Sequence, residues 1–319
     1  MIMDLRTGST TVAIIGGGPA GMSCANACLS FGLTPIVIER GGQVGGAQRT
    51  NFHPNLWMLG SPGESGEEMT RRMADHFTVL PVTTYYNTDV TRVTRDNQGF
   101  ELSLGGTDAA PEPIHADAIV LATGMRPHST IELEQLARES GTVIIGPLSH
   151  TIRDGIRDSN VLILGGGDNA LDHALYLVDK GNRVMVCARA AFSARAAFIQ
   201  SCSDTVGIDL RANHPPTRLL FKDGAIHAEW PNEEREFDWL LVMYGYRPNT
   251  DVLERMAPHL RPEMTTSGHV HVDTWQRTST PGIYAAGDIT DSPQPSVSAA
   301  IAQGLAAAKA IERDTGKRV

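Results

Sequence analysis

The chain has 319 residues, of which 41% are hydrophobic and 20% are charged, and its net charge at pH 7 is −9. This size and composition predict two globular α/β domains, and the acidic balance argues against a nucleic-acid partner. No apolar stretch approaches the roughly 20 residues that span a bilayer, and the N-terminus does not resemble a signal peptide, so we expect a cytoplasmic protein without membrane contact.

Two similar βαβ units are predicted. The apolar run at 11–15 is followed by GGGPAG, an alanine-rich stretch, and a second apolar run at 35–38. The same order recurs from 160 to 187, where NVLIL, GGGDNA, a helical stretch and RVMVC follow one another. Each series predicts a strand, a glycine turn, a helix and a strand. Two such units, about 150 residues apart, indicate two nucleotide-binding domains rather than a short-period repeat.

The domain order follows from two predicted connectors. Apolar runs at 118–122, 240–244 and 283–286 each precede a glycine and are expected to be strands. Glycine and then proline interrupt regular structure at 124–127 and at 245–250. We therefore expect residues 1–124 and 248–319 to form one domain, with residues 125–247 inserted as a second. The last predicted element is an alanine-rich helix from about 297 to 313.

The first glycine turn carries a dinucleotide fingerprint. Gly16, Gly18 and Gly21 form G-x-G-x-x-G directly after a strand, and Glu39 ends the next strand. In such motifs the glycines allow a tight turn and close approach of a pyrophosphate, which the helix N-terminus then binds. The acidic residue accepts hydrogen bonds from a ribose.

The second glycine turn is a variant of the first. Gly165, Gly167 and Ala170 give G-x-G-x-x-A, and the following strand ends without an acidic residue. Arg189, helped by Arg195, could neutralise a 2′-phosphate instead, which favours NADPH over NADH. The alternative is that both arginines lie on a solvated loop.

These motifs, in this order, resemble the low-molecular-weight thioredoxin reductase family over essentially the whole chain. The resemblance is carried by GGGPAG at 16–21, GGQ at 41–43, ATG at 122–124, GGGDNALDHALYL at 165–177, GYRPNT at 245–250 and GIYAAGDITD at 282–291. It implies an α/β fold with two Rossmann-like domains of the three-layer ββα type, the second inserted into the first. It also implies a homodimer, an FAD-binding domain at 1–124 and 248–319, and an NAD(P)H-binding-like domain at 125–247.

The resemblance implies the cofactor contacts as well. Asp288 would bind the FAD ribityl chain, and the backbone at Ser296 and Val297 would lie near the flavin pyrimidine edge. The remaining expected FAD contacts are Gly16, Gly18, Pro19, Ala20, Gly21, Glu39, Arg40, Gly42, Gln43, Asn51, Ala122, Thr123, Gly124 and Gly287. The expected NADPH contacts are Gly165, Gly167, Asp168, Asn169, Ala170 and Arg189.

The chain departs from that family in its cysteines. The family's C-x-x-C pair falls shortly before the second glycine motif, where this chain reads IIGPLSHTIRDG at 144–155. Disulfide exchange needs two thiols, so reduction of thioredoxin by the family's usual route is excluded. The four cysteines form neither a zinc motif nor a disulfide framework, and we expect them to be packed thiols, with no metal bound.

Two further departures bear on the nucleotide and on the family branch. The family's arginine-rich NADPH signature is reduced here to Cys187-Ala188-Arg189 with Ser193. Ferredoxin–NADP reductases with a thioredoxin-reductase fold also lack the cysteine pair. Those reductases usually carry a C-terminal extension that stacks an aromatic residue or a histidine on the flavin. We do not expect this extension here, because the sequence ends at Val319 directly after the predicted final helix.

His150 is the candidate catalytic residue, because it occupies the place of the missing cysteines. A histidine there could relay a proton to the flavin or to a substrate; the alternative is a surface histidine. His53 and Trp57 either border the flavin or serve in packing.

Three functions are compatible with these features. The leading hypothesis is an FAD-dependent oxidoreductase that passes electrons from NAD(P)H, with NADPH favoured, to a small molecule or an electron-transfer protein. A second is a nicotinamide-independent flavoenzyme, either an oxidase or an oxidoreductase of external dithiols and disulfides. A third is a non-catalytic nucleotide sensor.

Overall fold

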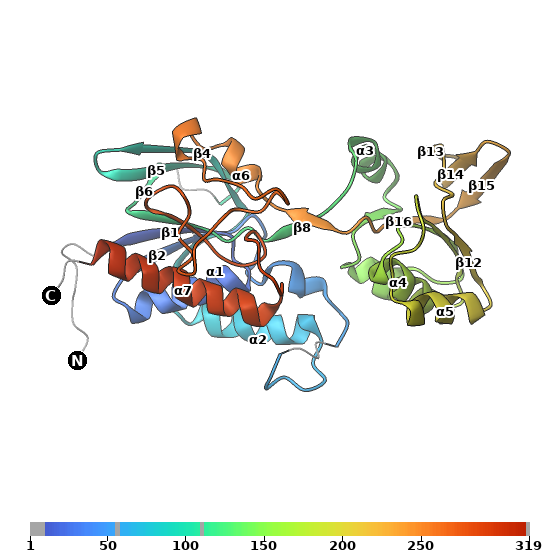
Figure 1. The fold of residues 1–319 in the computed structure, drawn as a ribbon, viewed down its shortest axis with the longest axis horizontal. Helices are drawn as coiled ribbons and strands as arrows, with labels where there is room; N and C mark the ends of the chain where they lie inside the picture. Colours follow the sequence, from blue (N-terminus) through green and yellow to red (C-terminus); the bar gives the residue numbers. More distant parts are fainter. Residues whose placement is uncertain (1–9, 55–57, 109–111, 317–319) are drawn as a thin grey trace. The chain divides into compact units, whose positions relative to one another are not determined.

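The computed structural model describes residues 10–54, 58–108 and 112–316 (Figure 1). The chain divides into two compact units. Unit 1 comprises Met1–Met125 and Pro248–Val319, and unit 2, Arg126–Arg247, is inserted into it. Within the described ranges, no helix has the length and apolar character needed to cross a membrane.

Unit 1 has three layers. Its central sheet is parallel, with strand order β18-β7-β1-β2-β3. Helices cover one side of this sheet, and an antiparallel sheet, β4-β5-β6, covers the other (Figure 1). The elements are β1 (Thr11–Ile15), α1 (Pro19–Ser30), β2 (Thr34–Ile38), α2 (Gly66–Thr78), β3 (Thr83–Tyr85), β4 (Thr88–Asp96), β5 (Gly99–Gly106), β6 (Ile114–Ala116), β7 (Ala118–Leu121), α6 (Asp251–Glu254), β18 (Ile283–Ala285) and α7 (Val297–Thr315), with short 3-10 helices at Gly46–Thr50 and Pro258–Leu260.

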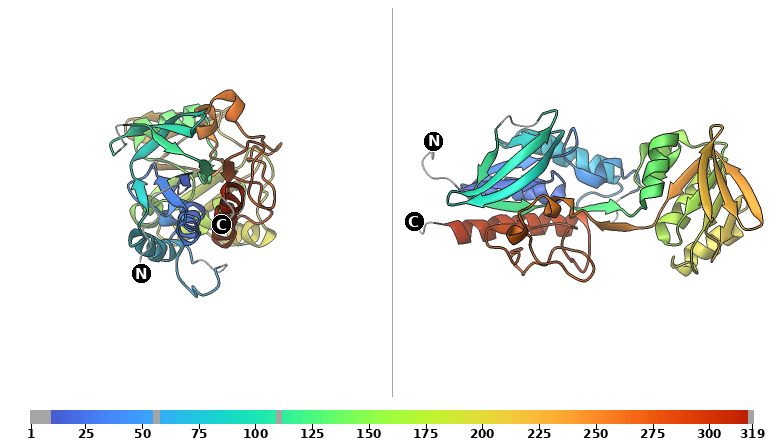
Figure 2. Two further views of the ribbon diagram at one scale, coloured as in Figure 1. Left: turned by 90° about the vertical axis from the view of Figure 1, so that its left-hand side faces the viewer. Right: turned by 90° about the horizontal axis from the view of Figure 1, so that it is seen from above.

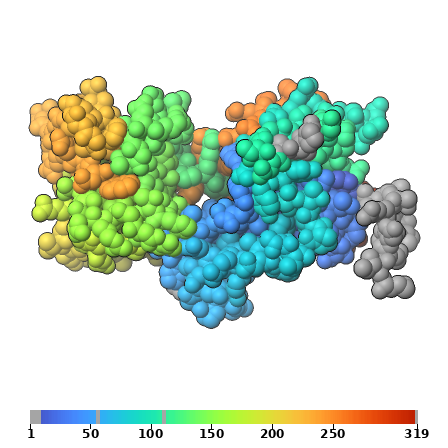
Figure 3. Space-filling view, turned by 180° about the vertical axis from the view of Figure 1, so that it is seen from behind, coloured from blue at the N-terminus to red at the C-terminus, as the bar shows by residue number. Residues whose placement is uncertain are grey.

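The layers follow from alternation along the buried strands. Val12 and Ile14 of β1 pack in one hydrophobic cluster with α1, α2 and α7, whereas Ala13 and Ile15 pack in another with β4 and β5. Successive strand residues point to opposite faces, so a strand that is apolar throughout must be covered on both. The outer face of β4 and β5 is polar and forms part of the surface drawn in teal in Figure 3. The expected ββα arrangement is confirmed.

Unit 2 repeats this plan. Its parallel sheet has strand order β12-β11-β10-β16-β9, and an antiparallel ribbon, β13-β14-β15, appears in yellow and orange in Figure 2. Leu162 and Leu164 of β10 pack with Ile226 and Ala228 of β14. The elements are α3 (Ile131–Ser140), β9 (Val143–Ile145), β10 (Asn160–Leu164), α4 (Asp168–Val178), β11 (Arg183–Cys187), α5 (Ala196–Asp204), β12 (Ile208–Arg211), β13 (Arg218–Lys222), β14 (Ala225–Trp230), β15 (Glu233–Phe237) and β16 (Trp239–Val242), with a π-helical turn at Thr151–Gly155.

A two-stranded ribbon forms where the chain passes from one unit to the other. β8 (Met125–Pro127) pairs with β17 (Tyr246–Pro248). Both strands lie in the segments that the glycine–proline breaks marked as connectors. The sequence predicted irregular chain here, and the structure instead shows short extended segments.

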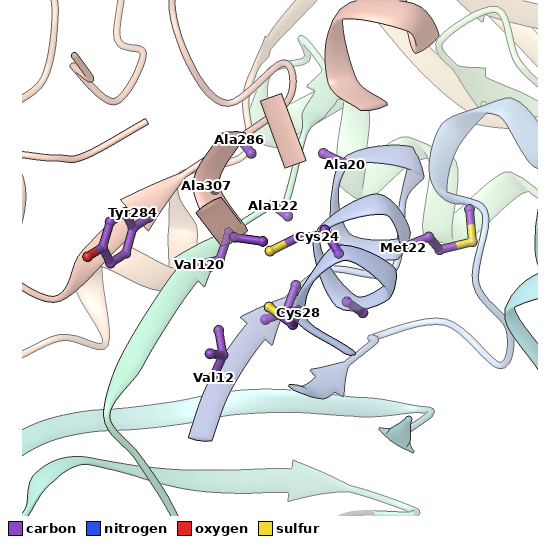
Figure 4. Packing of buried hydrophobic residues seen from close by; sticks show 14 of the residues in the cluster. Val12, Ala20, Met22, Cys24, Cys28, Val120, Ala122, Tyr284, Ala286 and Ala307 are labelled. Atoms are coloured by element: carbon purple, nitrogen blue, oxygen red, sulfur yellow. The ribbon is translucent and has the colours of Figure 1, made fainter. Parts of the chain in front are cut away.

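All four cysteines are free and buried. Cys24 and Cys28, on α1, point into the unit 1 core near Val12 and Val120 of the sheet (Figure 4). Cys187 ends β11 and Cys202 lies in α5. Burial raises the pKa of the Cys187 thiol to about 12 and that of Cys202 to about 11, which favours the protonated thiol.

Candidate functional site

The candidate FAD residues of unit 1 gather at one edge of its parallel sheet. The first glycine turn follows β1, Glu39 follows β2, the turn at 122–124 follows β7, and Gly287 and Asp288 follow β18. These strands are neighbours and run in the same direction, so their carboxyl ends meet. Nucleotides bind at this edge in open α/β sheets.

The glycine turn is shaped to receive a phosphate group. Gly16 has φ +109°, and a Cβ there would overlap the carbonyl oxygen of Ala122, so a larger residue is excluded. At Gly18, by contrast, a Cβ would meet only the Cα of Gly46, at 3.9 Å. Gly18 is the N-cap of α1 and no side chain caps this helix. Pro19 and Ala20 open its first turn, where uncapped N–H groups and the helix dipole favour an anion.

Glu39 lies beside this turn, and backbone N–H groups hold both of its carboxylate oxygens in place. Its Oε2 accepts from the N–H of Gly17 and its Oε1 from the N–H of Gly41, each at 2.6 Å. A carboxylate oxygen has two lone pairs, so each can accept one further hydrogen bond from a ribose hydroxyl. The site therefore fits the ribose and pyrophosphate of a dinucleotide.

Next to Glu39, Arg40 borders a cavity of about 420 Å³. The Nε of Arg40 lies 3.1 Å from Oδ1 of Asp89, and Nη1 of Arg255 lies 3.4 Å from the same oxygen. The other lining residues are Asn87, Thr88, Thr91, Gly105 and Gly106. Arg40, which follows Glu39 in the chain, is the residue that connects this cavity to the end of β2.

The loop that follows β2 is held against the glycine turn. The N–H of Gly45 donates to the carbonyl oxygen of Gly17 at 2.7 Å. Gly42 and Gln43 are exposed in this loop, whereas Asn51 bonds inside it, its Nδ2 donating to Oε1 of Gln48 at 2.8 Å. The ring of His53 lies 4.3 Å from that of Phe52, and Trp57 lies outside the described residues.

The turn at 122–124 is braced by Asn249, which the sequence did not single out. The hydroxyl of Thr123 donates to the carbonyl oxygen of Asn249 at 2.6 Å, and the N–H of Asn249 donates to that of Gly124 at 2.8 Å. The N–H of Ala122 donates to the carbonyl oxygen of Ile15 at 2.8 Å and so extends the pairing of β7 with β1 to the start of the turn. The bonds with Asn249 join segments about 125 residues apart. The only sequence signal for them was the presence of Asn249 and Thr250 in the GYRPNT motif.

Asp288 and the start of α7 complete this edge. Asp288 is half-buried, and burial raises the pKa of its carboxyl group while the charge of His269 lowers it. The N–H of Gly287 donates to Oε1 of Gln303 in α7 at 2.7 Å. Ser296 caps α7 by accepting from the N–H of Ala299 at 3.1 Å, and Val297 is the buried first residue of the helix.

In unit 2, the second glycine turn leads from β10 into α4. A Cβ at Gly165 would overlap the carbonyl oxygen of Met243, and Gly167 is an N-cap without side-chain capping. Ala170 closes the first turn, its N–H donating to Gly167 at 3.1 Å. The carbonyl oxygen of Asn169 lies 2.8 Å from Nδ1 of His173.

The two candidate arginines have different surroundings. Arg195 binds Asp168 twice, through its backbone N–H and through Nε, each at 2.8 Å. This ion pair is exposed and engages Nε of the guanidinium, so the contribution of Arg195 to binding a 2′-phosphate stays a prediction. Arg189 is exposed just after β11 and forms no ion pair within the described part of the chain.

His150 is exposed at the start of the π-helical turn of unit 2. Arg153 and, more weakly, His150 lower the pKa of the Asp154 carboxyl group. Two side chains of helix α4 contact backbone carbonyl oxygens of this segment. Nε2 of His173 lies 3.1 Å from the carbonyl oxygen of Pro147, and the Tyr176 hydroxyl donates to the carbonyl oxygen of Arg153 at 3.3 Å. His173 is buried, and its position in the helical pattern of the sequence does not identify its partner.

Comparison with known proteins identifies the family of the chain. The model of the family described as pyridine nucleotide-disulphide oxidoreductase matches residues 10–304. A ferredoxin–NADP reductase of Limosilactobacillus fermentum is 32% identical over 294 residues, covering 87% of this chain and 84% of that protein. A thioredoxin reductase of Spironucleus barkhanus is 25% identical over 318 residues, covering 95% and 97%.

Solved structures show the same fold. The thioredoxin reductase of Lactococcus lactis superposes with a TM-score of 0.76 at 22% identity, over 96% of this chain and 99% of that one. The match extends over both units, and the family model spans most of the sequence. The chain belongs to the pyridine nucleotide-disulphide oxidoreductase family, and it is an FAD-dependent oxidoreductase that works with a pyridine nucleotide.

Proposed function

We propose that the chain transfers electrons from NADPH, through FAD, to an acceptor outside the chain. The observation that carries this proposal is the combination of two dinucleotide turns with four free, buried cysteines. The turns provide for both cofactors, and the cysteines leave the chain without an exposed thiol pair that could serve as an internal acceptor.

Unit 1 would hold FAD at the carboxyl edge of its sheet. The N-terminus of α1 would bind the pyrophosphate and Glu39 the adenosine ribose, with the cavity beside Arg40 available to the adenosine end. Asp288 would accept from a ribityl hydroxyl, and the start of α7 would face the pyrimidine edge. When bound, FAD supplies an acceptor for a hydride and a donor of electrons to a second substrate.

Unit 2 would hold NADPH on its second glycine turn. Arg189 carries the preference for the 2′-phosphate in this proposal, because it is exposed at the end of β11 and has no acidic partner in the described chain. The relatives named ferredoxin–NADP reductase support NADP as the nucleotide.

The acceptor would be an electron-transfer protein, with a small molecule as the other class. The names of the same relatives support a ferredoxin-like partner. His150 would supply a proton at the step that needs one, since it stands in the segment that replaces the family's cysteine pair. We further propose a cytoplasmic homodimer, on the family resemblance.

An anaerobic reductive titration tests the proposal. One equivalent of NADPH should bleach the flavin band near about 450 nm completely, and NADH should do so much less readily. A requirement for two equivalents of NADPH per flavin would reveal a second two-electron centre and contradict the absence of an internal disulfide. A flavin that stays oxidised with both nucleotides would overturn the role of NADPH and favour direct oxidation or reduction of a substrate.

The acceptor is then identified with the reduced protein. Reoxidation should be followed separately with a ferredoxin, a benzoquinone, dioxygen and a thioredoxin disulfide. Rapid turnover with ferredoxin supports the electron-transfer partner, and turnover with the quinone or dioxygen alone supports the small-molecule class. Turnover with thioredoxin would contradict the proposal.

A further inference from the structure

Tyr244 leaves an aromatic ring exposed at the end of a buried strand of unit 2. It lies two residues after Val242, the fully buried last residue of β16, and it is 41% exposed. Met243, between the two, is buried. The carboxyl edge of a parallel sheet is where nucleotides bind, so an exposed aromatic side chain there is placed to contact the ring of a ligand.

The segment that carries Tyr244 is in backbone contact with the second glycine turn. Val242 is paired with Leu164, the last residue of β10, and the N–H of Met243 donates to the carbonyl oxygen of Leu164 at 2.7 Å. A Cβ atom at Gly165 would lie 2.4 Å from the carbonyl oxygen of Met243. Tyr244 therefore stands directly beside the turn.

Arg189 stands on the opposite side of the same turn. Cys187, the last residue of β11, is also paired with Leu164, and the N–H of Gly165 donates to the carbonyl oxygen of Cys187 at 3.0 Å. Tyr244 and Arg189 thus each lie two residues past the end of a strand that neighbours β10. Adjacent strands are about 5 Å apart, so two strands that flank a third are separated by about 10 Å.

A second aromatic side chain at this turn, Phe192, is packed against it. Its Cδ1 atom would lie 3.6 Å from a Cβ atom at Gly166. The N–H groups of Ser193 and Ala194 donate to the carbonyl oxygen of Gly166 at 2.8 and 3.0 Å and hold this loop in place. Phe192 is half-buried, so Tyr244 offers the more accessible ring.

The surroundings of Tyr244 keep its ring neutral. Burial raises the pKa of the hydroxyl group, while the charge of Arg189 lowers it, and the pKa is raised on balance. The hydroxyl group is therefore protonated at neutral pH. The ring can stack on a base without placing a negative charge beside the phosphates of a nucleotide.

We propose that Tyr244 is a platform on which the adenine ring of the pyridine nucleotide stacks. The inference rests on the proposed binding of NADPH at the second glycine turn. The 2′-phosphate and the base are attached to neighbouring carbons of the adenosine ribose, so a phosphate bound by Arg189 brings the base within reach of Tyr244. Stacking depends on the flat face of the base, which NADPH and NADH share, so Tyr244 would bind both nucleotides equally.

The test compares nucleotide binding to the FAD-loaded protein by isothermal titration calorimetry. Tyr244→Leu, which stays apolar but lacks the ring, should bind adenosine 2′,5′-bisphosphate about tenfold more weakly than the wild type. It should weaken NADPH and NADH by the same factor, whereas Arg189→Ala should weaken NADPH alone. Tyr244→Phe, which keeps the ring, should bind all three ligands like the wild type. Ile131→Ala, at an exposed apolar position at the start of α3, is the matched control and should change nothing.

Reduced nicotinamide mononucleotide distinguishes the two rings of the nucleotide. Tyr244→Leu should bind it like the wild type, because it contains no adenine. Weaker binding of this ligand, with adenosine 2′,5′-bisphosphate unaffected, would overturn the adenine assignment. If Tyr244→Leu binds every ligand like the wild type while Arg189→Ala weakens NADPH, the role of Tyr244 is overturned and the NADPH site stands. If the wild type binds neither NADPH nor the bisphosphate, the proposed NADPH site fails, and the role of Tyr244 fails with it.

Discussion

Gly304 of α7 lies so close to α1 that a Cβ atom at this position would overlap the carbonyl oxygen of Ala20. The same Cβ would lie 2.9 Å from the backbone nitrogen of Cys24. Both obstacles are backbone atoms, which cannot move without displacing the helix. Because α1 begins at the first glycine turn, this contact connects the packing of unit 1 to the turn that we propose binds the FAD pyrophosphate.

Gly304→Ala should therefore destabilise the protein by about 2–3 kcal/mol, as overpacking of a close helix contact does. It should also weaken FAD retention, since α1 must shift to make room. Denaturant unfolding and the flavin content after gel filtration measure the two effects. Ala302→Ser, at an exposed position of the same helix, is the control and should change neither. A Gly304→Ala protein with wild-type stability would show that the helices are less closely packed.

Arg189 should determine the preference for NADPH. Arg189→Ala should raise the KM for NADPH about tenfold, corresponding to the loss of one charge-assisted hydrogen bond, and leave the KM for NADH nearly unchanged. Steady-state kinetics with both nucleotides measure the ratio. Arg183, exposed at the opposite end of β11, supplies the matched control Arg183→Ala. Equal losses with both nucleotides would mean that Arg189 contributes to binding without reading the 2′-phosphate.

The four cysteines should be unreactive in the native protein. They are buried, and burial raises the pKa of Cys187 to about 12 and of Cys202 to about 11, so little thiolate forms at pH 8. A thiol reagent should react slowly with the native protein and with all four thiols after unfolding without reductant. Prior reduction with NADPH should not change the count. Fewer than four thiols in the unfolded, unreduced protein would indicate a disulfide.

His150 should act at the step that consumes or releases a proton. His150→Gln should lower turnover with the acceptor about 100-fold, the typical effect of losing a general acid or base, and remove one limb of the pH–rate profile. Bleaching of the flavin by NADPH should be affected much less. His259→Gln, at an exposed site in unit 1, is the control. Unchanged turnover in His150→Gln would leave this residue a surface histidine.

Asp314 should stabilise unit 1 in a pH-dependent way. Its carboxylate accepts two hydrogen bonds from Arg277, at 2.7 Å each, and one from the Tyr284 hydroxyl at 2.8 Å. The Arg277 guanidinium, followed by the Tyr284 hydroxyl, lowers the pKa of this carboxyl group. The lowered folded-state pKa means that the stabilisation is complete above the unfolded value, near about 3.9, and is lost as the pH falls through the folded value.

Asp314→Asn should thus cost about 1 kcal/mol at neutral pH, a value kept low because the group is partly exposed. The difference from the wild type should shrink below about pH 4. Denaturant unfolding at several pH values measures it, with the exposed Asp75→Asn as the control. A difference that stays constant into acid would assign the loss to packing rather than to charge.

The sequence anticipated the fold well, because its signals are local. A glycine turn between a strand and a helix depends on a few consecutive residues, so the two βαβ units could be located from their motifs. The three-layer arrangement, by contrast, was an expectation from the family resemblance, and the structure gives its physical reason in the burial of both faces of β1. The connectors were less predictable, because a proline break does not show whether the two segments pair with each other.

The candidate sites were predictable only in part. Glu39 could be identified because its place at the end of β2 brings it to the glycine turn in any fold of this class. The pairing of Arg195 with Asp168 could not, since it joins the N-cap of α5 to the first residue of α4, 27 residues earlier in the chain.

The sequence by itself determined that this chain has two nucleotide-binding units and no C-x-x-C pair, because both properties are written in consecutive residues. Only the tertiary structure decided which of the two arginines remains free of an acidic partner in the described chain and which helices must be in close contact. These relationships depend on distances between residues remote in sequence. Such distances are set when the strands pair and the helices pack, and no local pattern records them.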